Sequence, residues 1–170
     1  LVQETCSDEL KQILLSADSK ASKGLIFDLR GNNGGLLKNS VKMTSFFLSG
    51  GTISTIKSSD SIKHYVANPS SKVYEHPMVV LVNAQTASAG EIMTASLQQN
   101  KRALVVGDIT FGKGLVQKVF KLSNGQKFHI TVSEFLSPNG DPINKVGIVP
   151  DYIVMEEKDQ LLTALKVLEE

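Results

Sequence analysis

One short apolar segment, MVVLV at residues 78–82, restricts the fold of this chain more than any other feature. After a turn of small residues it is followed by AGEIMTASLQQN, in which Ala89, Ile92, Met93 and Leu97 fall on one helical face. A strand without polar alternation is typically buried on both faces, as in a parallel sheet covered by helices. The chain is therefore expected to have an α/β layer architecture.

The rest of the chain repeats this alternation of helices and strands. Residues 50–77 are more polar, with TISTIKS and IKHYVA as arms of a predicted hairpin, and we expect this segment to be a surface excursion. The apolar pattern also predicts helices at residues 7–17, with Ser7 as N-cap, at 36–47 and in the tail segment DQLLTALKVL, and strands at 24–30, 103–107, 115–122 and 127–135. The sequence contains no internal repeat.

Length and composition favour one domain and disfavour several classes of protein. A chain of 170 residues with 41% hydrophobic residues can bury one core, so we expect a single domain over residues 1–170. The formal net charge of +1 gives no broad field that would attract nucleic acid or an acidic membrane. Cys6 is the single cysteine, which rules out an internal disulfide and a cysteine-based zinc site.

The three histidines, His64, His76 and His129, do not indicate a metal site or a histidine-based catalytic triad. No two of them have helical ligand spacing, and the HExxH pattern is absent from the sequence. His64 and His76 lie in the polar excursion, and His129 lies in a strand without an acidic neighbour at a suggestive offset. We therefore expect no metal and no organic cofactor.

Ser88 is a candidate nucleophile because of its place at a predicted strand-to-helix turn. The hydroxyl follows a buried strand and lies at the start of a helix, where the unpaired N–H groups of the first turn can stabilise a developing oxyanion. The N–H of Ala89, the next residue, is the natural first donor. An ordinary N-cap serine has the same surroundings, so this motif alone does not separate a nucleophile from a helix cap.

Lys113 lies 25 residues after Ser88, in the segment FGKGLVQ. An amine can activate a serine hydroxyl without histidine, provided that the amine is uncharged. Burial disfavours the charged form, and the apolar neighbours are expected to bury this side chain. Gln117, four residues on, could orient the lysine through its neutral amide oxygen. A solvated surface lysine and an exposed strand glutamine are the alternatives.

Nucleotide binding is a weaker hypothesis for the same lysine. Gly107, Gly112 and Lys113 nearly match the phosphate-binding pattern GxxxxGK[ST], but position 114 is glycine and the segment LVQKVF alternates like a strand. That motif requires a helix at this place, since a helix N-terminus receives the phosphate. A nucleotide hydrolase therefore ranks well below a serine hydrolase.

Four segments resemble the core domain of the carboxyl-terminal processing peptidases, also called tail-specific proteases. They are FDLRGNNGGLL, LVNAQTASAGEIMTASL, RALVVGDITFGKGLVQ and SEFLSPNGDPINKVGIVPDYIV, and they occur in the order of the family. The resemblance runs from about residue 25 to the end. Two departures are Gly90, where the family often has serine, and Asn33, where it often has proline; neither removes a reacting group.

The resemblance implies a role for each candidate residue. Ser88 would be the nucleophile, Lys113 the general base and Gln117 its orienting partner in a serine endopeptidase that needs no cofactor. The oxyanion would be held by the backbone N–H groups of Gly34 and Ala89. The implied fold is α/β and crotonase-like, with stacked strand-and-helix units. The implied substrates are proteins or peptides with apolar C-terminal tails.

The resemblance also implies parts that this sequence does not contain. Family members usually carry a PDZ domain, which binds the substrate tail, and an export signal. The chain begins at Leu1 and has neither a leader pattern nor an apolar stretch of 18 residues, so we expect it to be a piece of a longer protein. The family implies a bacterial cell-envelope or periplasmic location, or secretion, and a homo-oligomer is possible.

A non-catalytic module that binds apolar ligands or peptides on the same fold is the main rival function, since a fold does not determine a function. Loss of either Ser88 or Lys113 would have favoured this rival. Both residues are present, so we expect the peptidase.

Overall fold

The computed structural model describes residues 2–3, 5–19 and 23–169, and its strands form two four-stranded sheets. The first sheet is parallel, in the order β1 (Leu25–Asp28), β4 (Met78–Val82), β5 (Leu104–Gly107) and β8 (Tyr152–Ile153). The second is antiparallel, in the order β3 (Ile62–Val66), β2 (Thr52–Lys57), β7 (Lys127–Leu136) and β6 (Leu115–Lys121). The expected α/β architecture is confirmed, with an added antiparallel sheet.

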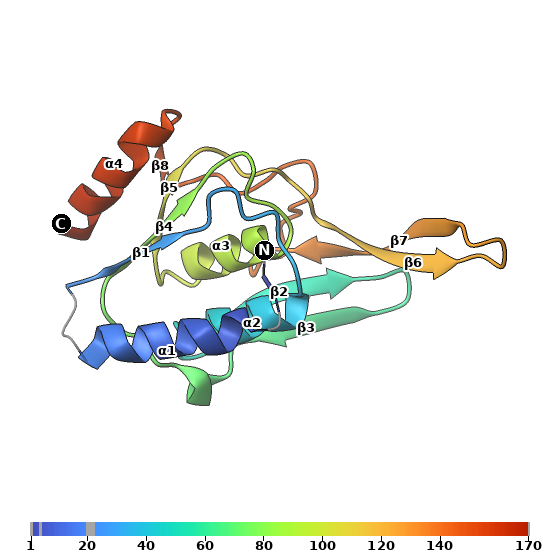
Figure 1. The fold of residues 1–170 in the computed structure, drawn as a ribbon, viewed down its shortest axis with the longest axis horizontal. Coiled ribbons are helices and arrows are strands. Elements are labelled where there is room, and N and C mark those ends of the chain that lie inside the picture. Colours follow the sequence, from blue (N-terminus) through green and yellow to red (C-terminus); the bar gives the residue numbers. More distant parts are fainter. Residues whose placement is uncertain (1, 4, 20–22, 170) are drawn as a thin grey trace.

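Helix α3 (Ala89–Gln99) lies in the middle of the molecule (Figure 1). Met93 and Leu97 belong to the core cluster that covers one face of the parallel sheet, whereas Ile92 and Ala95 belong to the cluster beside the second sheet. A helix with contacts on opposite sides is apolar around most of its circumference, and residues 89–97 are all buried. The N-terminal end of α3 is thereby held between the loops of both sheets.

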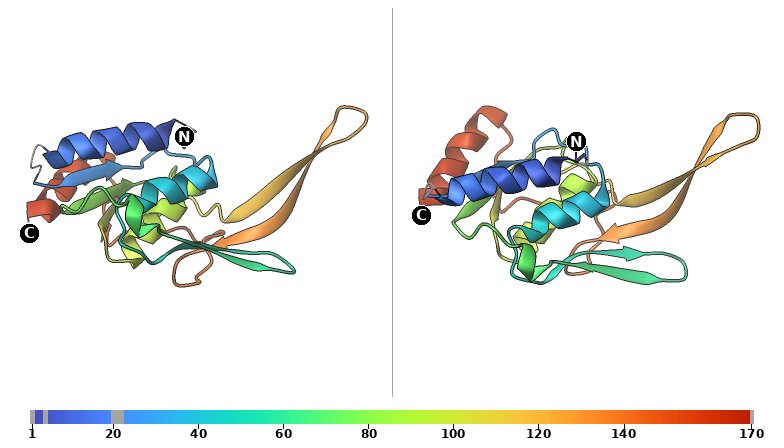
Figure 2. Two further views of the ribbon diagram at one scale, coloured as in Figure 1. Left: turned by 90° about the horizontal axis from the view of Figure 1, so that it is seen from below. Right: turned by 60° about the horizontal axis from the view of Figure 1, so that its bottom comes forward.

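The other helices cover the two faces of the parallel sheet. Helices α1 (Cys6–Ser19) and α2 (Leu37–Ser45) lie on the same side as α3, while α4 (Glu157–Glu169) lies on the other (Figures 1 and 2). There, Ala164 of α4 packs against Leu81 and Val106, whose neighbours Val80 and Val105 face the opposite cluster. Strand β4 therefore buries both faces, as the apolar run predicted. None of the described helices has the length and apolar content that a membrane span requires.

The first helix differs in detail from the prediction. It begins at Cys6, so Ser7 is not its N-cap but lies inside the first turn, where it is buried. Leu14 is fully buried, whereas Ile13 is 62% exposed. Successive helical residues point about 100° apart, so a helix that directs Leu14 into the core turns Ile13 toward solvent.

Residues 50–77 contain the predicted hairpin, formed by β2 and β3, and the short 3-10 helix η1 (Pro69–Ser71). Strand β3 is largely exposed at the sheet edge, but Ile53, Ser54 and Thr55 of β2 are buried, since β2 also pairs with β7. Strands β6 and β7 form a second hairpin that extends away from the helices as a long arm (Figure 2).

Candidate active site

Ser88 ends a sharp turn between β4 and α3. Its backbone angles are φ 54° and ψ −116°, a conformation that costs a non-glycine residue free energy and persists only where the surroundings enforce it. Thr86 supplies part of that constraint, because its hydroxyl donates to the carbonyl of Leu29 (2.9 Å) and accepts from the N–H of Asn83 (3.1 Å). The predicted strand-to-helix turn is confirmed, with the serine at the mouth of the helix.

Glu91 joins the Ser88 turn to the loop that carries Lys113. Its side chain is fully buried, and one carboxylate oxygen accepts from the N–H groups of both Ser88 and Lys113, each at 2.8 Å. The other oxygen accepts from the Thr110 hydroxyl (2.7 Å) and the Gly112 N–H (2.6 Å). Both oxygens act only as acceptors, as in an ionised carboxylate. One side chain thus holds the two candidate segments side by side.

Glu91 was not among the residues selected from the sequence. The signal was present, since serine followed three residues later by glutamate is a capping-box pattern. That pattern explains the bond from the Ser88 N–H to Glu91. It does not reveal the three further donors, because those belong to a loop about 20 residues away in the sequence.

Lys113 itself is exposed, so the predicted burial of its side chain is wrong for the unliganded chain. Of the apolar neighbours that were expected to cover it, Ile109 is 42% and Phe111 is 65% exposed. The reason is that the loop of residues 108–114 is anchored by the Thr110 side chain and by main-chain N–H groups, which leaves the side chains of Ile109, Phe111 and Lys113 outside. Lys113 and Phe111 line a cavity of about 270 Å³ next to the Ser88 turn, together with Asn33, Gln85 and Ala87.

Gln117 lies on β6 opposite Thr131 and is exposed. Lys113 lies in the loop before β6 begins at Leu115, so the strand alternation on which the predicted contact depended does not extend to it. Within the described residues the Gln117 side chain makes no hydrogen bond to Lys113. Its role as orienting partner stays a prediction.

Gly34 and Ala89 lie next to each other, as the expected pair of N–H donors requires. Gly34 has φ 102°, and a Cβ there would be 2.8 Å from the Cβ of Ser88 and 3.0 Å from the nitrogen of Ala89. The loop that carries Gly34 is tied to the turn because Ala87 donates its N–H to the carbonyl of Asn32 (2.9 Å). The Gly34 N–H donates to Asn32 Oδ1 (3.0 Å), so it must exchange this partner to bind an oxyanion.

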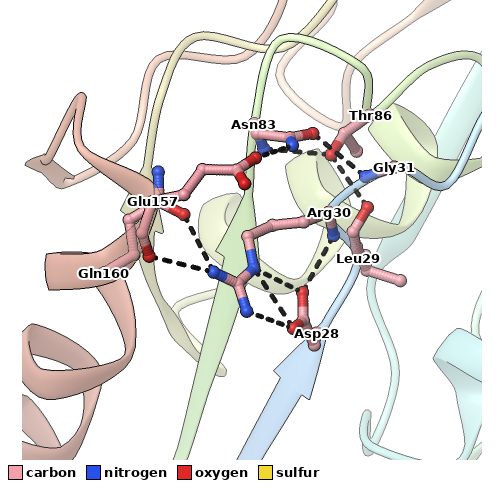
Figure 3. A network of polar contacts seen from close by, with 8 residues as sticks. All are labelled: Asp28, Leu29, Arg30, Gly31, Asn83, Thr86, Glu157 and Gln160. Atoms are coloured by element: carbon pink, nitrogen blue, oxygen red, sulfur yellow. Dashed lines mark hydrogen bonds and ion pairs between the residues drawn. The ribbon is translucent and has the colours of Figure 1, made fainter.

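A polar network lies on the far side of the same loop, between β1, β4 and the first turn of α4 (Figure 3). Arg30 forms an ion pair with Asp28 (2.6 Å). Burial acts to raise the pKa of Asp28, but the hydrogen bonds from Arg30 outweigh it, so the pKa lies below its ordinary value. The hydrogen bond to Asp28 in turn raises the pKa of Arg30. Both groups are therefore charged at neutral pH and hold the start of the loop in place.

The alternative sites find no support in the described part of the chain. His64 is exposed on β3 and hydrogen-bonds to Thr55 (2.9 Å). The side chain of His129 lies outside the described residues. Among the described residues no three His, Cys, Asp or Glu side chains are grouped as metal ligands. Strand β6, not a helix, follows Lys113, which removes the anion-binding end that a nucleotide-binding loop needs.

Comparison with protein families identifies what this arrangement is similar to. The model of peptidase family S41 matches residues 2–154. A carboxyl-terminal-processing protease of Synechocystis sp. is 40% identical over 147 residues, which are 86% of this chain and 34% of the relative. A carboxy-terminal processing protease of Bacillus subtilis is 37% identical over 148 residues, which are 86% of this chain and 32% of the relative. The chain thus spans about a third of the length of these relatives.

The fold matches solved structures of similar proteins. A photosystem II D1 C-terminal processing protease superposes with a TM-score of 0.87 at 33% identity, over 99% of this chain and 45% of that one. A lipoprotein from Streptococcus agalactiae shares the fold alone, with a TM-score of 0.76 at 20% identity. The crotonase-like α/β core that the sequence resemblance implied is confirmed by these matches.

Proposed function

The chain belongs to peptidase family S41, and from this premise we propose that it is the catalytic core of a serine endopeptidase that cleaves proteins near apolar C-terminal tails. The observation that carries the proposal is the single Glu91 oxygen that binds the main chains of both Ser88 and Lys113 at 2.8 Å. A buried carboxylate with four donors fixes the hydroxyl-bearing and amine-bearing segments together, which a mere helix cap does not require.

The proposed reaction uses only groups of this chain and water. Lys113 in its uncharged form takes the proton of the Ser88 hydroxyl, and the serine oxygen attacks the scissile carbonyl carbon. The N–H groups of Ala89 and Gly34 stabilise the oxyanion. Lys113 then returns the proton to the leaving amine, and water hydrolyses the acyl-enzyme by the same route. Gln117 would orient the amine after the β6 strand adjusts.

Substrate is proposed to complete the site, because Lys113 is exposed in the unliganded chain. An apolar substrate residue in the cavity beside Phe111 would exclude water from the amine and so favour its uncharged form. The substrate main chain would pair with a strand edge, as in β-augmentation. Strand β6 is an edge of the second sheet and follows directly after the Lys113 loop, so it is a suitable strand.

Labelling and cleavage together test this function in the full-length protein. A fluorophosphonate probe is expected to modify Ser88, and an unfolded protein with an apolar C-terminal tail is expected to be cleaved at least tenfold faster than the same protein with a charged tail. Labelling shows a reactive hydroxyl, and the tail dependence shows the substrate class. A protein that binds the tail but neither reacts with the probe nor cleaves is a binding module, and the proposal is then wrong.

Gly34→Ala is expected to lower kcat by about a hundredfold, the effect of losing an oxyanion donor. The added Cβ would lie 2.8 Å from the Cβ of Ser88 and 2.9 Å from the carbonyl oxygen of Ala87, so the two segments must move apart. Gly125→Ala is the matched control, because Gly125 also has positive φ (84°) but has nothing within 4 Å of the added atom. Equal kcat for the two variants would contradict the proposed role of Gly34.

We further propose that the whole protein carries a PDZ domain, acts in the bacterial cell envelope or outside the cell, and can form homo-oligomers. The support is the similarity to longer processing proteases, of which this chain spans about a third. Cell fractionation and the mass of the native protein would test the location and the oligomer. Recovery of the active protein only from the cytosol would contradict the location.

A further inference from the structure

We infer that the first turn of α4 is a positioning element for the oxyanion-binding loop, and that Glu157 and Gln160 are its positioning residues. The inference rests on the proposed peptidase function, but it concerns residues outside the reacting groups. Helix α4 lies on the face of the parallel sheet opposite to α3 (Figure 1). It touches the site through side chains of its N-terminal turn (Figure 3).

Glu157 reaches the loop through Asn83. Asn83 Nδ2 donates to Glu157 Oε1 (2.5 Å), while Asn83 Oδ1 accepts from the N–H groups of Gly31 (3.0 Å) and Gln85 (3.1 Å). Gly31 begins the turn that leads to Gly34, and Gln85 belongs to the Ser88 turn. Asn83 is therefore the junction at which α4, the oxyanion-binding loop and the nucleophile turn meet, and its orientation depends on an acceptor in α4.

Gln160 reaches the same loop through Arg30. Its side chain is fully buried, and its Oε1 accepts from Arg30 Nη1 (3.3 Å) while its Nε2 donates to the carbonyl of Val154 (2.8 Å). Arg30 Nη1 also donates to the carbonyl of Glu157 (3.3 Å), and its other donors bind Asp28. Arg30 is thus clamped between β1 and α4, and it directly precedes Gly31 in the sequence.

Between Arg30 and Gly34 the loop belongs to no strand, and its pairing with the chain begins at the bridge between Gly35 and Val2. Its described contacts here are the Asn83 bond at Gly31, the Asn32 bonds to Ala87 and Gly34, the Asn32 N–H bond to Leu29, and the Val2 N–H bond to the Gly34 carbonyl (2.7 Å). Without the α4 contacts, Arg30 keeps only its bonds to Asp28, and Asn83 loses the acceptor of its Nδ2 group. The start of the loop is then less restrained, and we expect the Gly34 N–H to shift relative to Ala89 even though Val2 still binds the Gly34 carbonyl. A displacement of about 1 Å is enough to weaken catalysis about a hundredfold.

The test measures kinetics and amide hydrogen exchange in the full-length protein. Glu157→Ala and Gln160→Ala are each expected to lower kcat about tenfold with KM within twofold, and to speed hydrogen exchange of residues 31–35 several-fold. Glu157→Gln keeps an acceptor for Asn83 Nδ2 and should restore most of the loss seen in Glu157→Ala. Lys158→Ala, at an exposed position in the same turn, is the control and should behave as wild type.

The outcomes separate this inference from the proposed function. If wild-type protein cleaves and both alanine variants keep its kcat and its hydrogen exchange, the positioning role is wrong and the peptidase stands. If Gln160→Ala does not fold because a buried amide is lost, Glu157→Ala carries the test, since Glu157 is exposed. If wild-type protein neither cleaves nor reacts with the serine probe while exchange responds as expected, the peptidase proposal fails and the structural coupling alone remains.

Discussion

Replacing Ser88 with alanine in the full-length protein is expected to lower kcat/KM for an unfolded protein substrate by about four orders of magnitude. The reason is that the neighbouring hydroxyls of Thr86 and Thr110 are buried and already donate to Leu29 and Glu91, so they cannot replace Ser88, and binding alone leaves only residual catalysis. Cleavage of a labelled protein with an apolar tail, followed by gel analysis, measures the effect. If Ser88 were only a helix cap, its loss would cost about 1 kcal/mol of stability and little activity.

The free energy of unfolding tests the role of Ser88 independently of activity. Glycine adopts positive φ without steric cost, so Ser88→Gly is expected to raise the free energy of unfolding by about 1 kcal/mol while abolishing cleavage. When a residue is kept in a strained conformation for function, replacing it raises stability and lowers activity. Urea unfolding of wild type, Ser88→Ala and Ser88→Gly measures it. An active glycine variant would contradict the nucleophile assignment.

Lys113→Ala is expected to abolish cleavage to the same extent, because the hydroxyl then has no base. Ser88 and Lys113 act as one unit in the proposed mechanism, so the double variant should be no slower than either single variant. Lys118→Ala removes an exposed lysine from the next part of β6 and is the control for loss of charge. Additive losses in the double variant would mean that the two residues act separately.

Glu91→Gln is also expected to have a large effect, although Glu91 touches no substrate in the proposed mechanism. The NH₂ group of the glutamine would face two of the N–H or O–H groups from which the carboxylate now accepts hydrogen bonds. Buried donors left without partners cost about 1–3 kcal/mol each. We expect the free energy of unfolding to fall by about 3 kcal/mol. We also expect kcat to fall about a hundredfold as the Ser88 and Lys113 segments separate.

The Glu91 experiment needs conditions in which the variant is still folded. Circular dichroism fixes the temperature at which both proteins are native, and cleavage is then compared there. Glu9→Gln, an exposed residue in the first turn of α1, controls for the change of charge. Glu91→Gln with wild-type stability and kcat would show that the carboxylate does not hold the two segments together.

Local pattern predicted most of the secondary structure. The run at residues 78–82 is the central strand β4, and the helical spacing from Ala89 to Leu97 is helix α3. Strand β8, with two residues, was missed because so short a segment carries no periodicity. The start of α1 was misplaced by two residues, because the helix begins at Cys6 and Ser7 lies buried in its first turn.

The candidate site was predicted from the chemistry of its residues and from the family resemblance. The part of the prediction that failed is the burial of Lys113. The apolar residues around Lys113 suggested burial, but Phe111 and Ile109 are exposed because their loop is anchored by Thr110 and by its main chain. Apolar composition does not state which way a loop side chain points. The same limit applies to Gln117, because Lys113 lies in the loop before β6 and the strand alternation assumed from the spacing does not reach it.

The sequence by itself determined which groups can react and which segments are strands and helices, because both depend on residue type and on short-range periodicity. Only the tertiary structure decided that Glu91 joins Ser88 to Lys113, and that Glu157 and Gln160 of the last helix reach the loop before Gly34. Apart from the local bond between Ser88 and Glu91, these contacts join residues 22 to 130 positions apart. Their partners are chosen by the packing of whole elements, which no local pattern encodes.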